Sequence, residues 1–377
     1  MRKKIRIILF MGLIFGGMLC NFFTKEKTFS EAENRFLAEK PVLTKENVLS
    51  GKFSEDYETY ITDQFSYRDS WIRMKTLTER ALLKQESNGV YFCKDGYLME
   101  KQDTKVFESK QAKKNKKSVI SFGNKMKKKF DKEHLKFIFV PTASEILQDK
   151  LPPFASPYPQ KKLLKELKEK IGNDYVVDVN AELLKHKEED VFYRTDHHWT
   201  AMGAYYAYAL WAEEAGLSPL LQSEFEIEKA SDTFLGTISS KVNMKLKPDE
   251  IFLYHKKNAP KYKVTYDMGT EVRDTLYDRK ALEEKDKYKV YLGGNYGMVE
   301  IDTGLHTGRK LLVVKDSFAH SFVPLACNQF DTTYMIDLRY FNVGIEKFLE
   351  AYEVTDILVL YNTVNLVTDK NIWKFKG

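Results

Sequence analysis

The chain has few cysteines, and their spacing forms no recognisable site. Cys20, Cys93 and Cys327 are the only three in 377 residues. At most one pair can form after the N-terminal segment, and neither a CxxC motif nor a Cys/His zinc spacing is present. The sequence therefore excludes a disulfide-stapled scaffold and a cysteine-based zinc domain. We expect no resident metal and no cofactor.

Charge is missing from residue 7 to residue 23, directly after four basic residues at positions 2–4 and 6. A basic start before an apolar run is typical of an exported segment whose first residues stay in the cytoplasm. The run is a little shorter than the roughly 20 residues that span a bilayer, so signal peptide and signal anchor both remain open for residues 1–24. We favour an anchor, since positions 17, 19 and 21 form no small-x-small cleavage site. The rest of the chain is then extracytoplasmic, or secreted if the segment is cleaved.

Lysine runs at 110–117 and 125–129 contribute most of the net charge of +6. Such runs bind nucleic acid in some proteins, but an exported chain meets little nucleic acid. We interpret them as solvated helix faces near anionic wall polymers or lipid. No nucleic-acid partner is expected.

Patterning divides the chain into three parts. Residues 25–110 are polar, with helix-compatible stretches at 53–62 and 70–83, and we interpret them as a membrane-proximal helical region. This part ends in a hairpin at 90–98 with Asp95-Gly96 as its turn.

Residues 111–377 alternate helical patterns with short apolar runs, which predicts an α/β domain with a parallel sheet covered on both faces by helices. Within it, residues 218–309 are polar and turn-rich, and we expect a β-rich insertion that carries substrate selectivity. The insertion has strand-like segments at 252–254, 264–266 and 290–292. The expected strands of the main sheet are 137–140, 175–179, 311–314, 333–338 and 357–360.

The most informative run is 195–200, which reads Thr-Asp-His-His-Trp-Thr before an apolar helical pattern. Histidine titrates near neutral pH, so an Asp-x-His pair suits an oriented general base. In an extended backbone, residues two apart lie on one side. Asp196 can then accept from one ring nitrogen of His198 and leave the other free. The competing interpretation is a helix cap formed by Asp196 or Thr200.

Ser317 offers a nucleophile for that base. It follows the apolar run 311–314 after only Lys315-Asp316, and a helical pattern begins directly after it. A serine between a strand and a helix suits nucleophilic attack, since free N–H groups at the helix start can stabilise an oxyanion. An N-capping serine without chemistry is the alternative.

These residues resemble the DHHW proteins of bacteria, which are related to the alginate O-acetyltransferase-like proteins and more distantly to SGNH hydrolases. The resemblance rests on four motifs that span nearly the whole chain. They are Asp196-His197-His198-Trp199, Lys315-Asp316-Ser317-Phe318, residues 30–37 (Ser-Glu-Ala-Glu-Asn-Arg-Phe-Leu) and residues 140–145 (Val-Pro-Thr-Ala-Ser-Glu).

The resemblance implies an SGNH-hydrolase-like fold and a triad of Ser317, His198 and Asp196. It implies an O-acetyltransferase that works on a cell-envelope or exopolysaccharide glycan through an acyl-serine. A membrane-bound O-acyltransferase partner would then supply the acyl group. Arg339 and Asn362 follow the next two expected strands and are candidates for binding substrate or an oxyanion, as is His197.

Three alternatives remain at this stage. A carbohydrate esterase would use the same triad with water as acceptor. A glycan-binding or assembly factor would keep the fold without catalysis. Asp-His-His is also a ligand set for zinc or manganese. Of the histidines that could complete such a site, His255 and His306 stand in unpromising contexts, and His320, three residues after Ser317, is the exception.

Overall fold

The computed structural model describes residues 2–30 and 35–376. Residues 31–34 of the motif at 30–37 lie outside this part. The chain forms two compact units, the first of Met1–Asn88 and Ser239–Lys245 and the second of Gly89–Ile238 and Leu246–Gly377. The candidate site belongs to the second unit.

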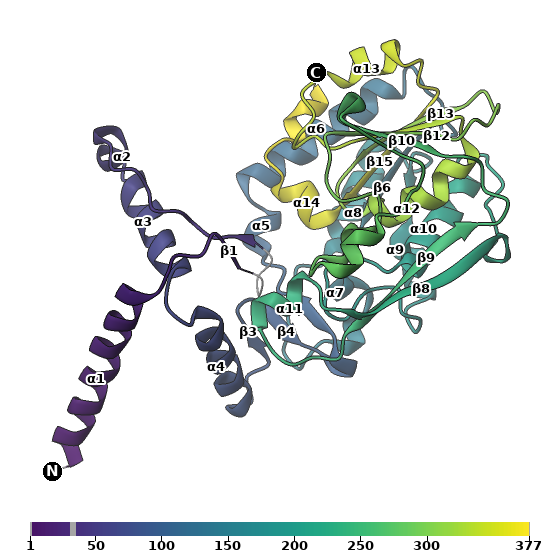
Figure 1. Cartoon of the computed structure of the whole chain (residues 1–377). Helices are drawn as coiled ribbons and strands as arrows, with labels where there is room; N and C mark the ends of the chain where they lie inside the picture. The colour runs from purple at the N-terminus through teal and green to yellow at the C-terminus, as the bar shows by residue number, and fades with distance from the viewer. Residues whose placement is uncertain (1, 31–34, 377) are drawn as a thin grey trace. The chain divides into compact units, whose positions relative to one another are not determined.

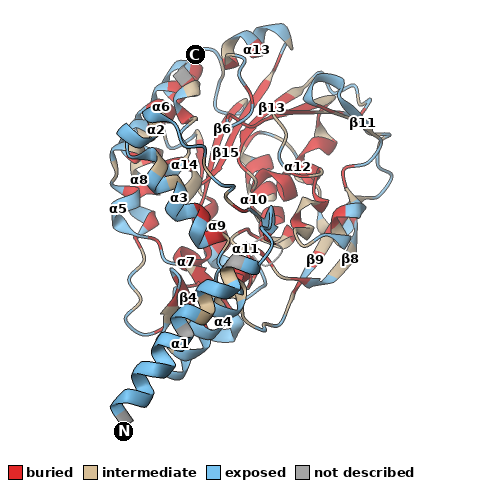
Figure 2. Ribbon diagram, turned by 60° about the vertical axis from the view of Figure 1, so that its left-hand side comes forward, coloured by how far each residue is buried: buried red, intermediate tan, exposed pale blue. Residues whose placement is uncertain are grey.

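Helices make up most of the first unit, and the helices expected at 53–62 and 70–83 are confirmed. α1 contains the one described helical stretch, Lys3–Asn21, that is long and apolar enough to cross a membrane, and most of its described residues are exposed (Figure 2). An anchor and a signal sequence both have this property. The helices are α1 (Arg2–Phe23), α2 (Lys45–Leu49), α3 (Lys52–Asp63) and α4 (Arg68–Ala81), and the short strands are β1 (Phe29–Ser30), β2 (Arg35–Phe36) and β3 (Glu86–Ser87).

The expected hairpin at 90–98 is confirmed. β4 (Val90–Phe92) pairs antiparallel with β5 (Leu98–Glu100). Asp95 and Gly96, in the connecting turn, have φ angles of 56° and 78°. Aspartate and glycine tolerate this left-handed backbone better than most residues, which explains why they occupy the turn.

An eight-stranded mixed sheet is the centre of the second unit (Figure 1). Its order is β11-β10-β12-β14-β13-β15-β6-β7. The strands from β14 to β7 are mutually parallel, as predicted, and β12, β10 and β11 continue the sheet antiparallel. The strands are β6 (Leu135–Val140), β7 (Val176–Val177), β10 (Lys263–Tyr266), β11 (Glu271–Arg273), β12 (Met298–Asp302), β13 (Lys310–Lys315), β14 (Thr332–Ile336) and β15 (Asp356–Asn362).

Both faces of this sheet are buried. Leu311 and Val313 of β13 pack into one core cluster, while Leu312 and Val314 pack into the other. Successive side chains of a strand point to opposite faces, so an apolar run such as 311–314 requires cover on both. The covering helices are α9 (Val179–Lys185), α10 (Ala201–Glu214) and α12 (Ala319–Ala326) on one face, and α6 (Lys110–Met126), α8 (Gln160–Ile171), α13 (Ile345–Ala351) and α14 (Thr363–Thr368) on the other.

The β-rich segment between 218 and 309 is confirmed, but part of it belongs to the main sheet. β8 (Phe225–Phe234) and β9 (Asp249–Lys256) form a separate antiparallel ribbon, whereas β12 pairs with β14. The strand expected at 290–292 is wrong. Lys287–Val290 is a 3₁₀ helix, η6, and Tyr291 forms only an isolated bridge with Tyr277.

Candidate active site

Ser317 lies on a tight turn between β13 and α12, at the C-terminal edge of the parallel strands. Asp316 shapes this turn, because its Oδ1 accepts the Phe318 backbone N–H over 3.0 Å. Its Oδ2 accepts the Asn362 backbone N–H at 2.7 Å and the Asn365 side-chain amide at 2.8 Å. Burial raises the pKa of Asp316. The serine itself is half-buried and stays accessible.

The run 195–200 forms a narrow loop before α10. Phe192 and Trp199 form an isolated antiparallel bridge that closes it. Thr200 caps α10 by accepting the Gly203 N–H at 3.2 Å. The cap predicted for this helix is therefore Thr200, which leaves Asp196 free for other contacts.

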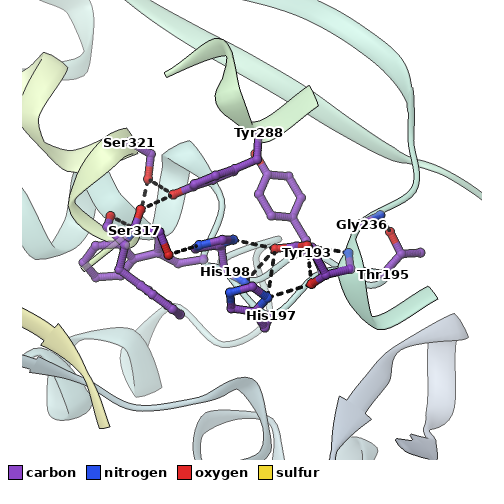
Figure 3. Close-up of polar contacts among 12 residues, drawn as sticks. Tyr193, Thr195, His197, His198, Gly236, Tyr288, Ser317 and Ser321 are labelled. Atoms are coloured by element: carbon purple, nitrogen blue, oxygen red, sulfur yellow. Dashed lines mark hydrogen bonds and ion pairs between the residues drawn. The ribbon is translucent and has the colours of Figure 1, made fainter. Parts of the chain in front are cut away.

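The structure brings Asp196, His198 and Ser317 into one hydrogen-bonded line (Figure 3). Nδ1 of His198 lies 2.6 Å from Oδ1 of Asp196, and Nε2 lies 2.7 Å from Oγ of Ser317. The side chains of His198 and Asp196 are 7% and 2% exposed. A carboxylate beside Nδ1 places the ring proton there, so Nε2 can accept the proton of the serine hydroxyl.

Thr237 completes the surroundings of Asp196. Oδ2 of the carboxylate accepts from the Thr237 backbone N–H at 2.7 Å and from its hydroxyl at 3.0 Å. Burial alone would raise the pKa of Asp196, but the electrostatic interactions of the carboxylate with His197 and His198, and its hydrogen bonds with His198 and the Thr237 backbone, lower this pKa below its ordinary value. The carboxylate therefore stays ionised and keeps orienting the imidazole.

Gly236, the residue before Thr237, packs directly against the same carboxylate. A Cβ at this position would lie 2.2 Å from Cβ of Asp196. Only glycine allows the backbone to approach this closely, which is what lets Thr237 reach Oδ2.

The pKa of His198 is lowered to about 4. Burial is the largest cause and positive charge on His197 adds to it, while the Asp196 carboxylate opposes both. The free base is thus the resting form of the ring at neutral pH, as a proton acceptor requires.

His197 points to Thr237 and not to the serine in the contacts that the structure gives. Its Nδ1 lies 2.8 Å from the Thr237 hydroxyl, and its side chain is 35% exposed. Ligand atoms of Asp196, His197 and His198 all lie within 4.8 Å of one another, so the three could hold a metal ion. Both ring nitrogens of His198 already have partners within the chain, and a metal would have to displace one of them.

Arg339 and Asn362 lie at the same edge of the sheet but contact other groups. The guanidinium of Arg339 binds Asp337 through Nε at 2.9 Å and Nη2 at 2.6 Å, and Nη2 also reaches Asn295. The side-chain amide of Asn362 donates to the Val140 carbonyl at 3.0 Å.

A buried charged cluster lies behind the serine turn. Lys315 is 1% exposed, and its Nζ lies 2.8 Å from Nε2 of His320 and 3.3 Å from Oδ2 of Asp337. An ammonium can only donate, so Nε2 of His320 accepts and the ring is neutral. Burial lowers the pKa of both Lys315 and His320. Because Nε2 of His320 accepts a hydrogen bond from Lys315, this nitrogen is not available as a metal ligand.

Two aromatic residues contribute to the site without having been predicted to do so: Trp199 entered only as part of the Asp196–Trp199 motif, and Tyr288 carries no sequence signal of its own. Trp199 donates to the Phe318 carbonyl and to the Ser321 hydroxyl, both at 3.0 Å. Tyr288 stacks on His198, and its hydroxyl lies 3.1 Å from Oγ of Ser321. Each is a buried aromatic whose polar end has found a partner, and aromatic composition alone cannot distinguish such residues from ordinary core.

Comparison with known proteins identifies related chains. A family described as DHHW protein matches residues 115–336. A DHHW family protein from Eubacterium siraeum has a similar structure, with a TM-score of 0.60, 24% identity, and coverage of 77% of this chain and 96% of that one. Bacillus cereus PatB1 with a sulfonyl adduct also has a similar structure, with a TM-score of 0.64 and 20% identity. The match covers 76% of this chain and 98% of PatB1. No curated protein matches the chain. These structures share the mixed α/β fold.

Proposed function

The chain belongs to the DHHW protein family, and from this premise we propose that it is a serine O-acetyltransferase acting on a cell-envelope or exopolysaccharide glycan. The observation that carries the proposal is the position of His198, 2.6 Å from Asp196 and 2.7 Å from Ser317. These separations are within the reach that proton transfer needs. The same separations favour an enzyme over a glycan-binding or assembly factor, for which Ser317 and His198 would have no reason to meet.

The first step forms an acyl-serine. Oγ of Ser317 attacks the carbonyl carbon of the acyl donor while its proton passes to Nε2 of His198. The bond to the donor's oxygen then breaks, and the leaving alcohol takes the proton from His198. Asp196 stabilises the imidazolium that exists between these events.

In the second step, a glycan hydroxyl attacks the acyl carbon and gives its proton to His198. Ser317 leaves and recovers that proton, so the enzyme returns to its starting state. In the described part of the chain, no protein group accepts the Ser317 backbone N–H, which can therefore donate to the oxyanion of either tetrahedral intermediate.

A cell-envelope glycan as acceptor would require the reaction to take place outside the cytoplasm. In this proposal α1 anchors the chain, and the basic residues at its start stay on the cytoplasmic side. A membrane-bound O-acyltransferase partner would deliver the acyl group. A carbohydrate esterase is the second candidate, because water can replace the glycan hydroxyl without any change in the triad.

An acyl-transfer assay tests the proposal. The purified full chain in detergent is given 4-nitrophenyl acetate with and without an oligosaccharide acceptor, and nitrophenol and acetylated sugar are both measured. Acetylated sugar supports the transferase, whereas nitrophenol release that is unaffected by the acceptor and yields no acetylated sugar supports the esterase. Ser317→Ala should abolish both reactions and leave the thermal midpoint nearly unchanged, since a half-buried hydroxyl contributes little to the core. Ser121→Ala, on the exposed face of α6, is the matched control.

Covalent labelling separates a nucleophile from a metal site. PatB1, whose fold this chain shares, forms a sulfonyl adduct, so phenylmethanesulfonyl fluoride is a suitable probe, read by intact mass. The wild-type chain should gain one sulfonyl group and Ser317→Ala none. If instead a chelator removes turnover, added zinc or manganese restores it and Ser317→Ala remains active, then Asp196, His197 and His198 act as metal ligands and the triad is wrong.

A further inference from the structure

Tyr288 contacts both the base and the nucleophile turn of the proposed site. It is 4% exposed and comes from η6, within the β-rich segment and far in sequence from either motif. Its ring lies parallel to the imidazole of His198, with ring centroids 3.8 Å apart and an interplanar angle of 9° (Figure 3). This contact is the closest of the ring contacts made by His198, since His197 and Phe318 lie at 3.9 and 4.9 Å and are tilted.

The hydroxyl of Tyr288 reaches the other half of the site. It donates to the Ser317 carbonyl oxygen at 3.3 Å and lies 3.1 Å from the hydroxyl of Ser321. One side chain thus spans from the general base to the first turn of α12. Ser321 also accepts from Trp199, so the loop of His198 and η6 meet at the same hydroxyl.

The segment that carries Tyr288 is itself held in place. The Val290 carbonyl accepts the Asp278 N–H at 2.8 Å, and the Leu292 N–H donates to Leu276 at 3.0 Å. The hydroxyl of Tyr291 donates to the Phe252 carbonyl of β9 at 2.7 Å. A buried side chain on a segment held by these hydrogen bonds can fix the orientation of the side chains that it contacts.

We propose that Tyr288 is a positioning residue of the triad. Its ring fixes the plane of the His198 imidazole, and its hydroxyl fixes the Ser317 turn, so that Nε2 and Oγ stay in line. The electron-rich ring face also stabilises the positive charge that His198 carries after it accepts the serine proton. This inference rests on the proposed function of Ser317 and His198, and it gives the β-rich segment a role in assembling the site.

Two variants separate the ring from the hydroxyl. Tyr288→Leu removes the stacked face and should lower kcat by about 100-fold, the cost of a small misplacement of reacting groups. Tyr288→Phe keeps the ring and should lower kcat by roughly 5-fold, as expected for one neutral hydrogen bond. KM should stay within about 2-fold in both, because an interaction made only in the transition state affects kcat. Tyr262→Phe removes a tyrosine hydroxyl that donates to Oδ1 of Asn328, outside η6 and the triad, and should retain wild-type kcat.

The result that overturns the proposal is a folded Tyr288→Leu protein with wild-type kcat, or one whose defect is confined to KM. If Tyr288→Leu does not fold, Tyr288→Phe decides, and an unchanged kcat then counts against the proposal.

A measurement without turnover keeps this test distinct from that of the function. In ¹⁵N-histidine NMR, His198 of the wild type should show a single tautomer with the proton on Nδ1, and Tyr288→Leu should show averaged ring nitrogens. If the wild type transfers no acyl group but this spectral change occurs, the enzyme proposal fails and the positioning role stands. If turnover is present and the ring signals of Tyr288→Leu match the wild type, the positioning role fails alone.

Discussion

The indole N–H of Trp199 donates to the carbonyl oxygen of Phe318 over 3.0 Å, 119 residues along the chain. This contact joins the residue directly after His198 to the residue directly after Ser317. The base and the nucleophile are therefore fixed relative to each other through their neighbours, in addition to their own hydrogen bond. The indole is fully buried, so nothing but the chain can replace the donor.

Trp199→Phe should weaken both stability and catalysis. The substitution leaves the Phe318 carbonyl and the Ser321 hydroxyl without the indole donor, and an unsatisfied buried group costs about 1–3 kcal/mol. We expect the free energy of unfolding in urea to fall by that amount. We expect kcat to fall as well, because the Ser317 turn loses its hydrogen bond to Trp199. Trp373→Phe, at an indole that is 58% exposed, should change neither quantity. Wild-type kcat in a destabilised Trp199→Phe protein would show that the Trp199–Phe318 hydrogen bond stabilises the fold but does not contribute to catalysis.

The pH profile of the reaction should reflect the lowered pKa of His198. The ring must be neutral to accept the serine proton, so kcat/KM should fall only as the pH drops through about 4. An unperturbed histidine would lose activity near 6.5. The measurement is kcat/KM between pH 3.5 and 8, with the folded fraction monitored by circular dichroism at each pH. A loss of kcat/KM near pH 6.5 would mean that burial does not lower the pKa of His198.

The lowered pKa of His198 also makes the free energy of unfolding depend on pH. The folded-state pKa of His198 lies below its unfolded value, so the ring contributes stability above about pH 6.5 that is lost as the pH falls towards 4. His320 acts in the same direction because burial lowers its pKa too. Asp196, whose pKa is also lowered, contributes above its unfolded value of about 3.9 and loses that contribution at lower pH. His198→Gln should therefore reduce, but not abolish, the loss of stability between pH 6.5 and 4.

Gly236→Ala should distort the site although it adds only one methyl group. The new methyl group would stand 2.2 Å from Cβ of Asp196, so either the loop of Asp196 or that of Thr237 must move. We expect kcat to fall by about 100-fold, because Asp196 would no longer hold the imidazole in line. Gly344→Ala is the control, since nothing lies within 4 Å of a Cβ there. Full activity in Gly236→Ala would show that the contact with Asp196 can relax freely.

Removal of the N-terminal segment tests the anchor. A chain that begins at Lys25 should stay in the supernatant after membranes are pelleted, because α1 holds the only membrane-length apolar helix in the described residues. The full chain should sediment with the membranes and resist a high-salt wash. A shortened protein that still sediments after that wash would point to a second membrane contact, for which the lysine runs are the first place to look.

Local pattern predicted much of the second unit. The run 311–314 predicted a strand buried on both faces, and the following Asp-Ser predicted the turn, because both signals lie within a few residues. The Asp-x-His spacing likewise indicated a carboxylate beside the ring. The contact between His198 and Ser317 depends on strand order, and no local pattern contains that information.

The residues that were not predicted have their roles assigned by tertiary packing. Thr237, Asn365 and Tyr288 bond to Asp196, Asp316 and the serine turn only after segments far apart in the sequence have met. The error at 290–292 has a related cause. Val290 is buried, which an apolar strand also predicts, but here the burial comes from a 3₁₀ turn packed between other elements.

The position of β15 has a consequence for how the chain is made. This strand lies between β13 and β6, so the middle of the sheet is closed by residues synthesised long after β6. The bond from Asn362 to Val140 joins positions 222 apart in the sequence. Contacts of such separation form slowly, and β6 can pair only with β7 until residues 356–362 have left the ribosome. The second unit therefore cannot complete the middle of its sheet, or the two core layers packed on it, before β15 has been synthesised.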